Sequence, residues 1–322
     1  MESLDMPALS VVIPVYLSEE ILPELVNQLE EAINSSPAIA KKFEIVMVCD
    51  DSPDDSWTTI TQLASTRPHL KGLLLRTNAG QHNALMAGLR VASGDTVVTM
   101  DDDLQHSPKD IPSLLELLDQ GNDVVFAKFK ARRHSWWKVL GSKFNDFFAI
   151  YLLGKPKDVY LSPFRAFHSE LSKDIQRYRG PYVYIDGLIL ASTTRIGSIE
   201  VAHHERYKGA SGYNLRKSIS LWLKMATGFS IAPLRLTSLA GLIISMLGFL
   251  LAIALIVQKL TIDTMPDGWA SIIVTILIIG GMQLLALGVI GEYLGRLLLT
   301  VNAKPQFVVA ETIHLTDVDV LP

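Results

Sequence analysis

Three consecutive aspartates, Asp101–Asp103, and the nearby Gln105 are the residues of this chain whose types and spacing best suit chemistry. They follow Thr96–Met100, an apolar run that predicts a buried strand. Carboxylates at the carboxyl end of a strand lie where an open α/β sheet usually binds its ligand. Carboxylate and amide oxygens suit Mg²⁺ or Mn²⁺, which usually share their ligand shell with substrate phosphates. A metal site is one interpretation, and an acidic turn that caps a helix near Pro108 is the other.

Runs with the character of strands alternate with runs of helical periodicity in the N-terminal part of the chain. The strand-like runs begin at Leu9, Phe43, Lys71, Thr96 and Asp123. The helical segments between them cover Glu19–Asn34, Asp55–Thr66, Gln81–Ala92 and Pro108–Asp119. This alternation and spacing indicate βαβ units. The sequence therefore predicts an α/β fold, Rossmann-like, with a mostly parallel sheet and helices on both faces.

Polar residues also follow the other predicted strands. Asp50 and Asp51 end the second strand, and Asn78–Gln81 forms a polar turn that opens a helix, a natural place to meet phosphate. The first strand ends at Tyr16 without a glycine, which disfavours a dinucleotide fingerprint or a Walker loop. Ordinary helix-capping loops are the alternative interpretation. Together with Asp101–Asp103, these strand ends predict a nucleotide-diphosphate site with a metal.

Two long apolar runs near the C-terminus, Leu236–Val257 and Trp269–Ile290, contain no charged residue. Each exceeds the roughly 20 residues that a helix needs to cross a bilayer. The chain is 49% hydrophobic and only 19% charged, so it is more apolar than a typical soluble domain. A pair of buried core helices is the alternative, which the short polar loop between the runs disfavours. The sequence predicts a two-helix membrane hairpin.

Basic residues flank the predicted hairpin on one side. They are Arg216, Lys217, Lys224 and Arg235 before the first run, and Arg296 and Lys304 after the second. The connecting loop, Gln258–Gly268, carries one lysine and two aspartates. The positive-inside rule therefore predicts a multi-pass protein with its N-terminal domain and both termini in the cytoplasm. The single cysteine, Cys49, excludes intrachain disulfides and fits that reducing compartment.

Two further segments have the character of membrane-surface elements. The basic run Lys128–Arg133 precedes Trp136–Leu153, whose aromatic face indicates either an interfacial helix or packing against the sheet. Asn214–Phe229 combines an apolar side with basic residues, which predicts an amphipathic helix beside the membrane. The predicted domains are 1–213 for the α/β domain, 214–235 for the amphipathic helix, 236–290 for the hairpin and 291–322 for a cytoplasmic tail.

Short motifs spread over nearly the whole chain resemble those of family 2 glycosyltransferases with the GT-A fold. They are SVVIPVY (Ser10–Tyr16), DDSPD (Asp50–Asp54), NAGQHNALMAGL (Asn78–Leu89), SGD (Ser93–Asp95), DDDLQHSP (Asp101–Pro108), HHERYKGASGY (His203–Tyr213), PLR (Pro233–Arg235) and GEYLGR (Gly291–Arg296). In combination they are similar to the branch that loads a sugar onto a polyisoprenyl phosphate. That branch includes dolichol-phosphate mannose synthase and the bacterial undecaprenyl-phosphate glucosyl- and aminoarabinose-transferases. The resemblance implies a GT-A domain and a hairpin in the inner (cytoplasmic) membrane.

The resemblance also implies roles for individual residues. The nucleotide sugar would be held by Pro14, Tyr16, Asp50, Asp51, Gln81, Asp101 and Asp102, the metal by Asp101, Asp103 and Gln105, and the acceptor phosphate by Lys128, Lys138 and Ser142. Catalysis would involve Asp103, Asp158 and Arg206, the last closing over the diphosphate from a loop.

Three positions depart from the family pattern. Lys138 stands where arginine is more usual, and Gly212 stands where a lysine is common. The family has an aspartate six residues before an arginine, but the residue six before Arg165 is Val159 and Asp158 is one further away. Either the loop is longer by one residue and Asp158 serves, or that carboxylate is absent. A phosphate acceptor, with a second pKa near ~6, is already anionic and needs positioning more than proton removal.

The implied reaction is the inverting transfer of one sugar from a nucleotide-diphosphate sugar to a polyprenyl phosphate such as undecaprenyl phosphate, with Mg²⁺ or Mn²⁺. The implied partners are this donor (a UDP-sugar is favoured over GDP-mannose), the polyprenyl phosphate and the lipid bilayer, with no nucleic acid; a homo-oligomer stays open. The stretch Asn78–His82 leans toward the aminoarabinose-transferase branch, but the sequence does not name the sugar. The alternatives are transfer to another lipid or lipid-linked acceptor, and a degenerate membrane scaffold subunit. A processive polysaccharide synthase would need more membrane spans.

Overall fold

The computed structural model describes most of the chain. The described residues are 8–36, 42–129, 155–156, 159–180, 182–201, 232–261, 268–302 and 305–315. Contacts divide the chain into two units: Met1–Asn214 together with Ala303–Pro322, and Leu215–Asn302. The first unit therefore contains both ends of the chain, and the second is inserted between them in sequence.

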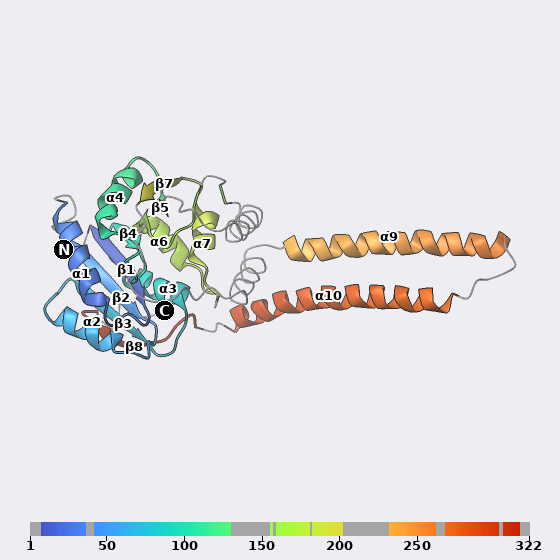
Figure 1. Ribbon diagram of the computed structural model, residues 1–322, viewed down its shortest axis with the longest axis horizontal. Coiled ribbons are helices and arrows are strands. Elements are labelled where there is room, and N and C mark those ends of the chain that lie inside the picture. The colour runs from blue at the N-terminus through green and yellow to red at the C-terminus, as the bar shows by residue number, and fades with distance from the viewer. Residues whose placement is uncertain are drawn as a thin grey trace. The chain divides into compact units, whose positions relative to one another are not determined.

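Eight strands of the described residues form one sheet in the first unit (Figure 1). They are β1 Leu9–Val15, β2 Phe43–Cys49, β3 Leu70–Leu75, β4 Thr96–Thr99, β5 Val124–Phe129, β6 Arg165–His168, β7 Ile196–Val201 and β8 Val309–Ile313. Their order across the sheet is β7-β5-β6-β4-β1-β2-β3-β8. The pairs β1–β2, β1–β4, β2–β3 and β5–β7 are parallel, whereas β6 and β8 are antiparallel to their neighbours. The predicted α/β fold with a mostly parallel sheet is confirmed.

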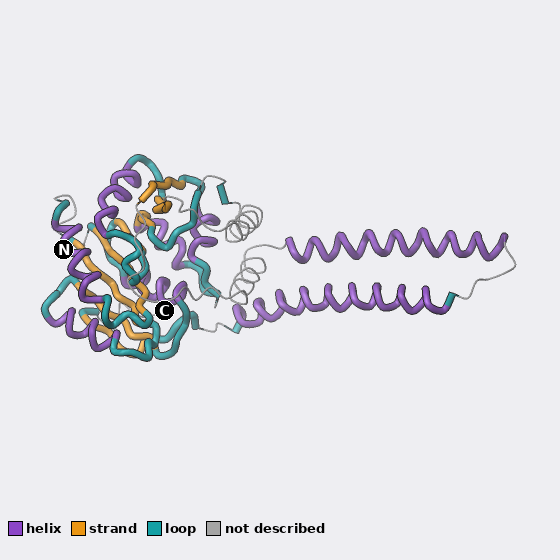
Figure 2. Tube along the Cα trace, viewed as in Figure 1, coloured by secondary structure: helices purple, strands orange, loops and turns teal. Residues whose placement is uncertain are grey.

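Helices cover both faces of this sheet, as Figure 2 shows by the purple coils on either side of the orange strands. One face carries α1 Leu22–Asn34, α2 Ser56–Ser65 and α4 Ile111–Asp119, the last preceded by the short 3₁₀ helix Pro108–Asp110. The other face carries α3 Gln81–Val91, α6 Ser169–Gln176 and α7 Ile185–Ser192. All seven residues of β1 are buried, because a central strand of a parallel sheet is covered on both sides.

The sequence explains the packing of the individual helices. Leu22, Leu25, Leu29 and Ile33 recur at helical spacing and form the buried stripe of α1. In α3 the packing is closer, since Gly88 lies directly over β1. A β-carbon added at Gly88 would lie 2.4 Å from Cγ1 of Val12. The absence of a side chain at Gly88 therefore sets how closely α3 approaches the sheet.

The residues that follow the second unit return to the sheet. β8 pairs antiparallel with β3 and covers an edge whose backbone groups would otherwise be unpaired. Just before β8, the buried Gln306 donates through its amide nitrogen to the carbonyl oxygens of Tyr178 and Gly180, both at 2.9 Å. Its amide oxygen accepts a hydrogen bond from Arg90 at 2.9 Å. From its sequence this segment was expected to be a cytoplasmic tail, and no strand was predicted there.

The second unit contains two long helices that lie side by side, α9 Ala232–Thr261 and α10 Trp269–Val301 (Figure 1). Within them, Leu234–Leu251 and Ile278–Val301 are long and apolar enough to cross a membrane. None of the residues whose burial is described in either segment is buried, so the alternative of soluble core helices does not fit. Both helices extend beyond the predicted apolar runs. The predicted interfacial helix Trp136–Leu153 and amphipathic helix Asn214–Phe229 lie outside the described residues.

We expect Gly88→Ala to lower the free energy of unfolding by about 1–3 kcal/mol, because the new methyl group would overlap a stiff valine on β1. Thermal unfolding of the detergent-purified full chain would measure this. In a Val12→Ala background the overlap is relieved, and Gly88→Ala should then cost little or stabilise α3 through its better helix propensity. Equal losses in both backgrounds would contradict this account of the α3 packing.

Candidate functional site

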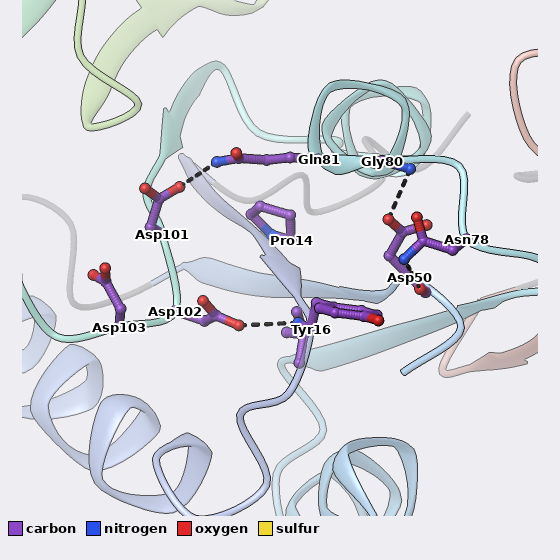
Figure 3. Close-up of a pocket in the computed structure, with 10 residues that line it drawn as sticks. Pro14, Tyr16, Asp50, Asn78, Gly80, Gln81, Asp101, Asp102 and Asp103 are labelled. Carbon is purple, nitrogen blue, oxygen red and sulfur yellow. Dashed lines mark hydrogen bonds between the residues drawn. The ribbon is translucent and has the colours of Figure 1, made fainter. Parts of the chain in front are cut away.

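A polar cavity of about 440 Å³ opens at the carboxyl ends of β1, β2 and β4 (Figure 3). It is lined by Pro14, Val15, Tyr16, Asp50, Asn78, Gly80, Gln81, Asp101, Asp102 and Asp103. Its volume lies in the range of small-molecule sites, about 300–1,000 Å³. The strand register explains the convergence: Val15 pairs with Cys49 and Val12 with Thr99, so the loops that follow these three parallel strands share one edge.

Asp50 organises one side of the cavity by holding the polar turn that precedes α3. Its carboxylate accepts hydrogen bonds from the backbone amides of Ala79 at 2.7 Å and Gly80 at 2.8 Å. The Asn78 side chain donates in turn to the carbonyl oxygen of Asp50 at 3.1 Å. Burial raises the pKa of Asp50, and the two amide hydrogen bonds oppose the rise. Gly80 has φ = 87°, a conformation that favours glycine, so this turn depends on its residue type.

Asp102 fastens the loop after β1 to the loop after β4. Its carboxylate accepts a hydrogen bond from the Tyr16 amide at 3.1 Å (Figure 3). It accepts a second one from the Ser18 hydroxyl at 2.5 Å. Burial raises the pKa of Asp102, and these hydrogen bonds oppose the rise. Asp102 therefore anchors Tyr16, a residue that is 46% exposed beside the cavity.

Asp101 lies across the cavity from Asp50 and accepts a hydrogen bond from the Gln81 side chain at 2.6 Å (Figure 3). Burial, followed by the negative charges of Asp103 and Asp102, raises the pKa of Asp101 to about 7. The positive charge of Arg165 opposes this rise. The site thus concentrates negative charge that a bound cation would neutralise.

Three loops at this edge contain non-glycine residues with left-handed backbone conformations. They are Leu17 (φ = 59°) after β1, Asp51 (φ = 51°) after β2 and Leu104 (φ = 56°) after β4. Such residues are uncommon, cost on the order of 1 kcal/mol or more, and cluster at functional sites. The same edge therefore carries both the polar cavity and the backbone strain.

The metal prediction can be tested against the geometry of the acidic residues. Among the described residues, no three Asp, Glu, His or Cys side chains gather as a ligand set. Mg²⁺ does not require such a set, because it is usually bound by one or two carboxylates together with substrate phosphates and water. Asp101 and Asp103 both line the cavity, and their mutual repulsion favours a cation. The residues present therefore fit a metal that is shared with a diphosphate.

The structure brings together most of the residues predicted for the donor and the metal. Pro14, Tyr16, Asp50, Gln81, Asp101, Asp102 and Asp103 all line the cavity. Three others do not line it: Asp51 is exposed after β2, Gln105 donates its backbone amide to Asp103 at 3.1 Å, and Lys128 lies on β5, 4.0 Å from Glu200. Lys138, Ser142, Asp158 and Arg206 lie outside the described residues.

The sequence prediction of the site omitted several residues. Asn78 and Gly80 line the cavity, and their signal was present, since they belong to the polar turn identified before α3. Val15 lines the cavity because it is the last residue of β1, and its apolar side chain gave no sign of this in the sequence. Arg165 acts on Asp101 from β6, although nothing in the local sequence places it near the acidic triplet.

Comparisons with known proteins identify the family of this chain. The family model described as Glycosyl transferase family 2 matches residues 10–176. The undecaprenyl-phosphate 4-deoxy-4-formamido-L-arabinose transferase of Proteus mirabilis is 35% identical over 94% of this chain and 93% of its own. The enzyme of the same name from Edwardsiella ictaluri is 34% identical over 96% of this chain and 95% of its own. A solved mannosyltransferase, PcManGT of Pyrobaculum calidifontis with GDP-Man and Mn²⁺, is 19% identical with a TM-score of 0.49, over 69% of this chain and 64% of its own.

We expect Asp101→Asn to stabilise the metal-free protein at pH 8 by about 1–3 kcal/mol. Each unit of pKa corresponds to about 1.4 kcal/mol of stability, and partial exposure of the carboxylate to solvent reduces this free energy. The folded-state pKa of Asp101, about 7, lies above its ordinary value of 3.8. The wild type therefore loses stability as the pH rises between these values, and the gain of the variant should shrink toward pH 4. Denaturation at several pH values with a chelator would measure this.

Asp54→Asn provides a control of opposite sign. Although burial raises it, the pKa of Asp54 is held below its ordinary value by hydrogen bonds from Ser52, Ser56 and the Glu19 amide. This variant should lose stability at neutral pH, and the loss should diminish as the pH falls through the folded-state pKa. An Asp101→Asn gain that does not depend on pH would contradict the charge argument.

Proposed function

We propose that this chain, which belongs to glycosyl transferase family 2, transfers one sugar from a UDP-sugar to undecaprenyl phosphate at the cytoplasmic membrane face. We further propose that the sugar is 4-deoxy-4-formamido-L-arabinose. The observation that carries the proposal is the end-to-end similarity to transferases named for this acceptor and sugar, at 34–35% identity over at least 93% of either chain. The described cavity supports it, because carboxylates and the start of α3, a helix N-terminus suited to bind phosphate, lie on one edge.

The donor would lie across the strand ends. Tyr16 offers an exposed aromatic ring beside the cavity, a surface on which a nucleobase can stack. Pro14, Asp50 and Asp51 are proposed for the base and ribose, with Asp50 also holding the Asn78–Gly80 turn in place. The diphosphate would face Gln81 at the start of α3 and the carboxylates of Asp101, Asp102 and Asp103, with Gln105 close in sequence.

Mg²⁺ or Mn²⁺ held by Asp101 and Asp103 would supply positive charge where the leaving diphosphate gains negative charge. The chain contributes by holding these carboxylates, and the residues beside them, in the positions that the bound donor requires. Asp102 does so by tying Tyr16 to the acidic loop, and Gln81 by holding Asp101. Arg206 is proposed to add a cation over the diphosphate.

The acceptor phosphate would attack the anomeric carbon from the side opposite the diphosphate, which inverts the configuration. Its oxygen is already anionic at neutral pH, so binding and orientation supply most of what the step needs. Lys128, Lys138 and Ser142 are proposed to hold this phosphate. Asp158 is proposed as the remaining catalytic carboxylate.

The chain organisation supports a location at the membrane. Two apolar helices are inserted between segments that form one unit, because β8 pairs with β3 in the same sheet. If both helices span a bilayer, the N-terminal part and β8 must lie on the same side. The basic flanks of the hairpin favour the cytoplasmic side.

The first test uses membranes that contain the protein, undecaprenyl phosphate, Mg²⁺ or Mn²⁺, and a panel of labelled nucleotide sugars. We expect label from UDP-4-deoxy-4-formamido-L-arabinose to enter a mild-acid-labile lipid. Asp103→Asn should reduce the rate at least about 100-fold, because it removes charge from the diphosphate site. Label from another donor would change the sugar, and no lipid product with intact nucleotide binding would point to a different acceptor. The absence of nucleotide binding would favour the scaffold alternative.

The topology can be tested by cysteine labelling, because the single native Cys49 is buried. We expect Lys173→Cys in α6 and Ala310→Cys in β8, both exposed positions, to react only from the cytoplasmic side. Thr264→Cys, between the two helices in sequence, should react from the opposite side. Labelling of Lys173→Cys and Ala310→Cys from different sides would contradict the hairpin.

A further inference from the structure

A buried cation lies behind the cavity. The side chain of Arg165, the first residue of β6, is 1% exposed, although a guanidinium is costly to bury without partners. Its Nε donates to the Thr99 hydroxyl at 3.1 Å, it pairs with the Asp186 carboxylate, and it lies 5.7 Å from the centre of the Phe126 ring. Thr99 ends β4 two residues before Asp101, so Arg165 is fixed just behind the acidic triplet.

Asp186 connects this cation to the helices on the same face of the sheet. It lies in the first turn of α7 and accepts a hydrogen bond from the Tyr184 hydroxyl. The Tyr184 ring meets His82 edge-on, with 5.1 Å between the ring centres. His82 is the second residue of α3 and follows Gln81, which donates to Asp101.

These contacts close a ring, which we call the Arg165 ring. Its members are Asp101, Gln81, His82, Tyr184, Asp186, Arg165 and Thr99, the last being two residues from Asp101 again. A closed ring restrains the end of β4, the start of α3 and the start of α7 relative to one another. Residues that orient the direct ligands of a metal commonly matter about 10–100-fold for metal affinity or activity, and Asp101 is one of the proposed metal ligands.

A second ion pair in the same unit lacks such a connection. Glu44, 4% exposed, lies 2.5 Å from Lys71 and also accepts hydrogen bonds from Ser10 and Ser93. It stands near the start of β2, six residues before Asp50, which is about 20 Å along the strand from the cavity. Glu44 therefore provides a matched control: a buried carboxylate in an ion pair, remote from the site.

We propose that Arg165 and Asp186 are positioning residues: their ion pair holds Asp101 and the first turn of α3 in the arrangement that binds the donor diphosphate. The inference rests on the proposed function for the identity of the ligand. Neither residue lines the cavity, so both act through Asp101 and Gln81. The affinity for the donor then depends on where the side chains of Asp101 and Gln81 are held, and not only on their presence.

The first experiment needs no ligand. Hydrogen–deuterium exchange of the full chain in detergent would compare wild type, Asp186→Asn, Tyr184→Phe and Glu44→Gln. We expect Asp186→Asn to increase exchange at least about fivefold in peptides that cover residues 79–85 and 100–104, and Tyr184→Phe to give a smaller increase in the same peptides. Glu44→Gln should increase exchange around Ser93 and Lys71 instead. Unchanged exchange at residues 79–85 in both ring variants would overturn the proposal.

The second experiment measures the binding of UDP in the presence of Mn²⁺. We expect Asp186→Asn to bind about tenfold more weakly and Asp186→Glu to recover part of the loss, whereas Glu44→Gln stays within about twofold of wild type. Tyr184→Phe, which loses only a hydroxyl, serves if Asp186→Asn fails to fold. Equal binding by wild type and both ring variants would overturn the proposal. A wild type that binds no nucleotide would overturn the proposed function instead, while the exchange data would still decide whether the ring positions α3.

Discussion

The candidate site depends on the parallel register of β1 with its two neighbours. Because β2 and β4 run in the same direction as β1, the loops that carry Tyr16, Asp50 and Asp101 meet at one edge. β1 is buried along its whole length on both faces, so a slip of one residue would exchange the side chains that pack on the two faces and rotate these groups away from one another. Burial of the central strand thus secures both the stability of the sheet and the geometry of its polar edge.

Gathering carboxylates at one edge of the sheet costs free energy because their negative charges repel one another. The carboxylates of this site have different roles. The carboxylates of Asp50 and Asp102 accept hydrogen bonds from groups of the protein. These donors include the backbone amides of Ala79, Gly80 and Tyr16. They hold loops, and they are shielded by those hydrogen bonds. Burial raises the pKa of all three, Asp50, Asp101 and Asp102. Asp101, which receives one hydrogen bond from Gln81, has its pKa raised to about 7, which indicates charge that the protein alone does not balance. A cation brought with an anionic substrate would complete that balance.

The sequence predicted the elements of the first unit well where the signal was local. The strands β1 to β5 and the helices α1 to α4 carry apolar periodicity, and the polar strand ends identified the edge that holds the cavity. Arg165 and β8 could not be found this way, since their importance comes from partners distant in sequence. Arg165 meets Asp186 only because β6 inserts beside β4, and β8 pairs with β3 across more than two hundred residues. The different roles of the neighbouring aspartates could also be recognised only in the structure. The sequence shows three consecutive carboxylates, but it does not show which hydrogen-bond donors each of them contacts.

β8 also constrains how the chain can fold. The outer edge of β3 is paired by residues that follow both long helices in the sequence. The sheet can therefore be completed only after the two helices have been synthesised. Pairing of such distant segments is slow, because closing the loop costs entropy before contacts compensate for it. An apolar hairpin held in a bilayer would shorten that search, since it returns the chain to the side from which it left. The buried Gln306, joined to Arg90, Tyr178 and Gly180, then fixes the returning segment in place. The hairpin is therefore best regarded as an insertion within the catalytic unit rather than as an anchor appended to it.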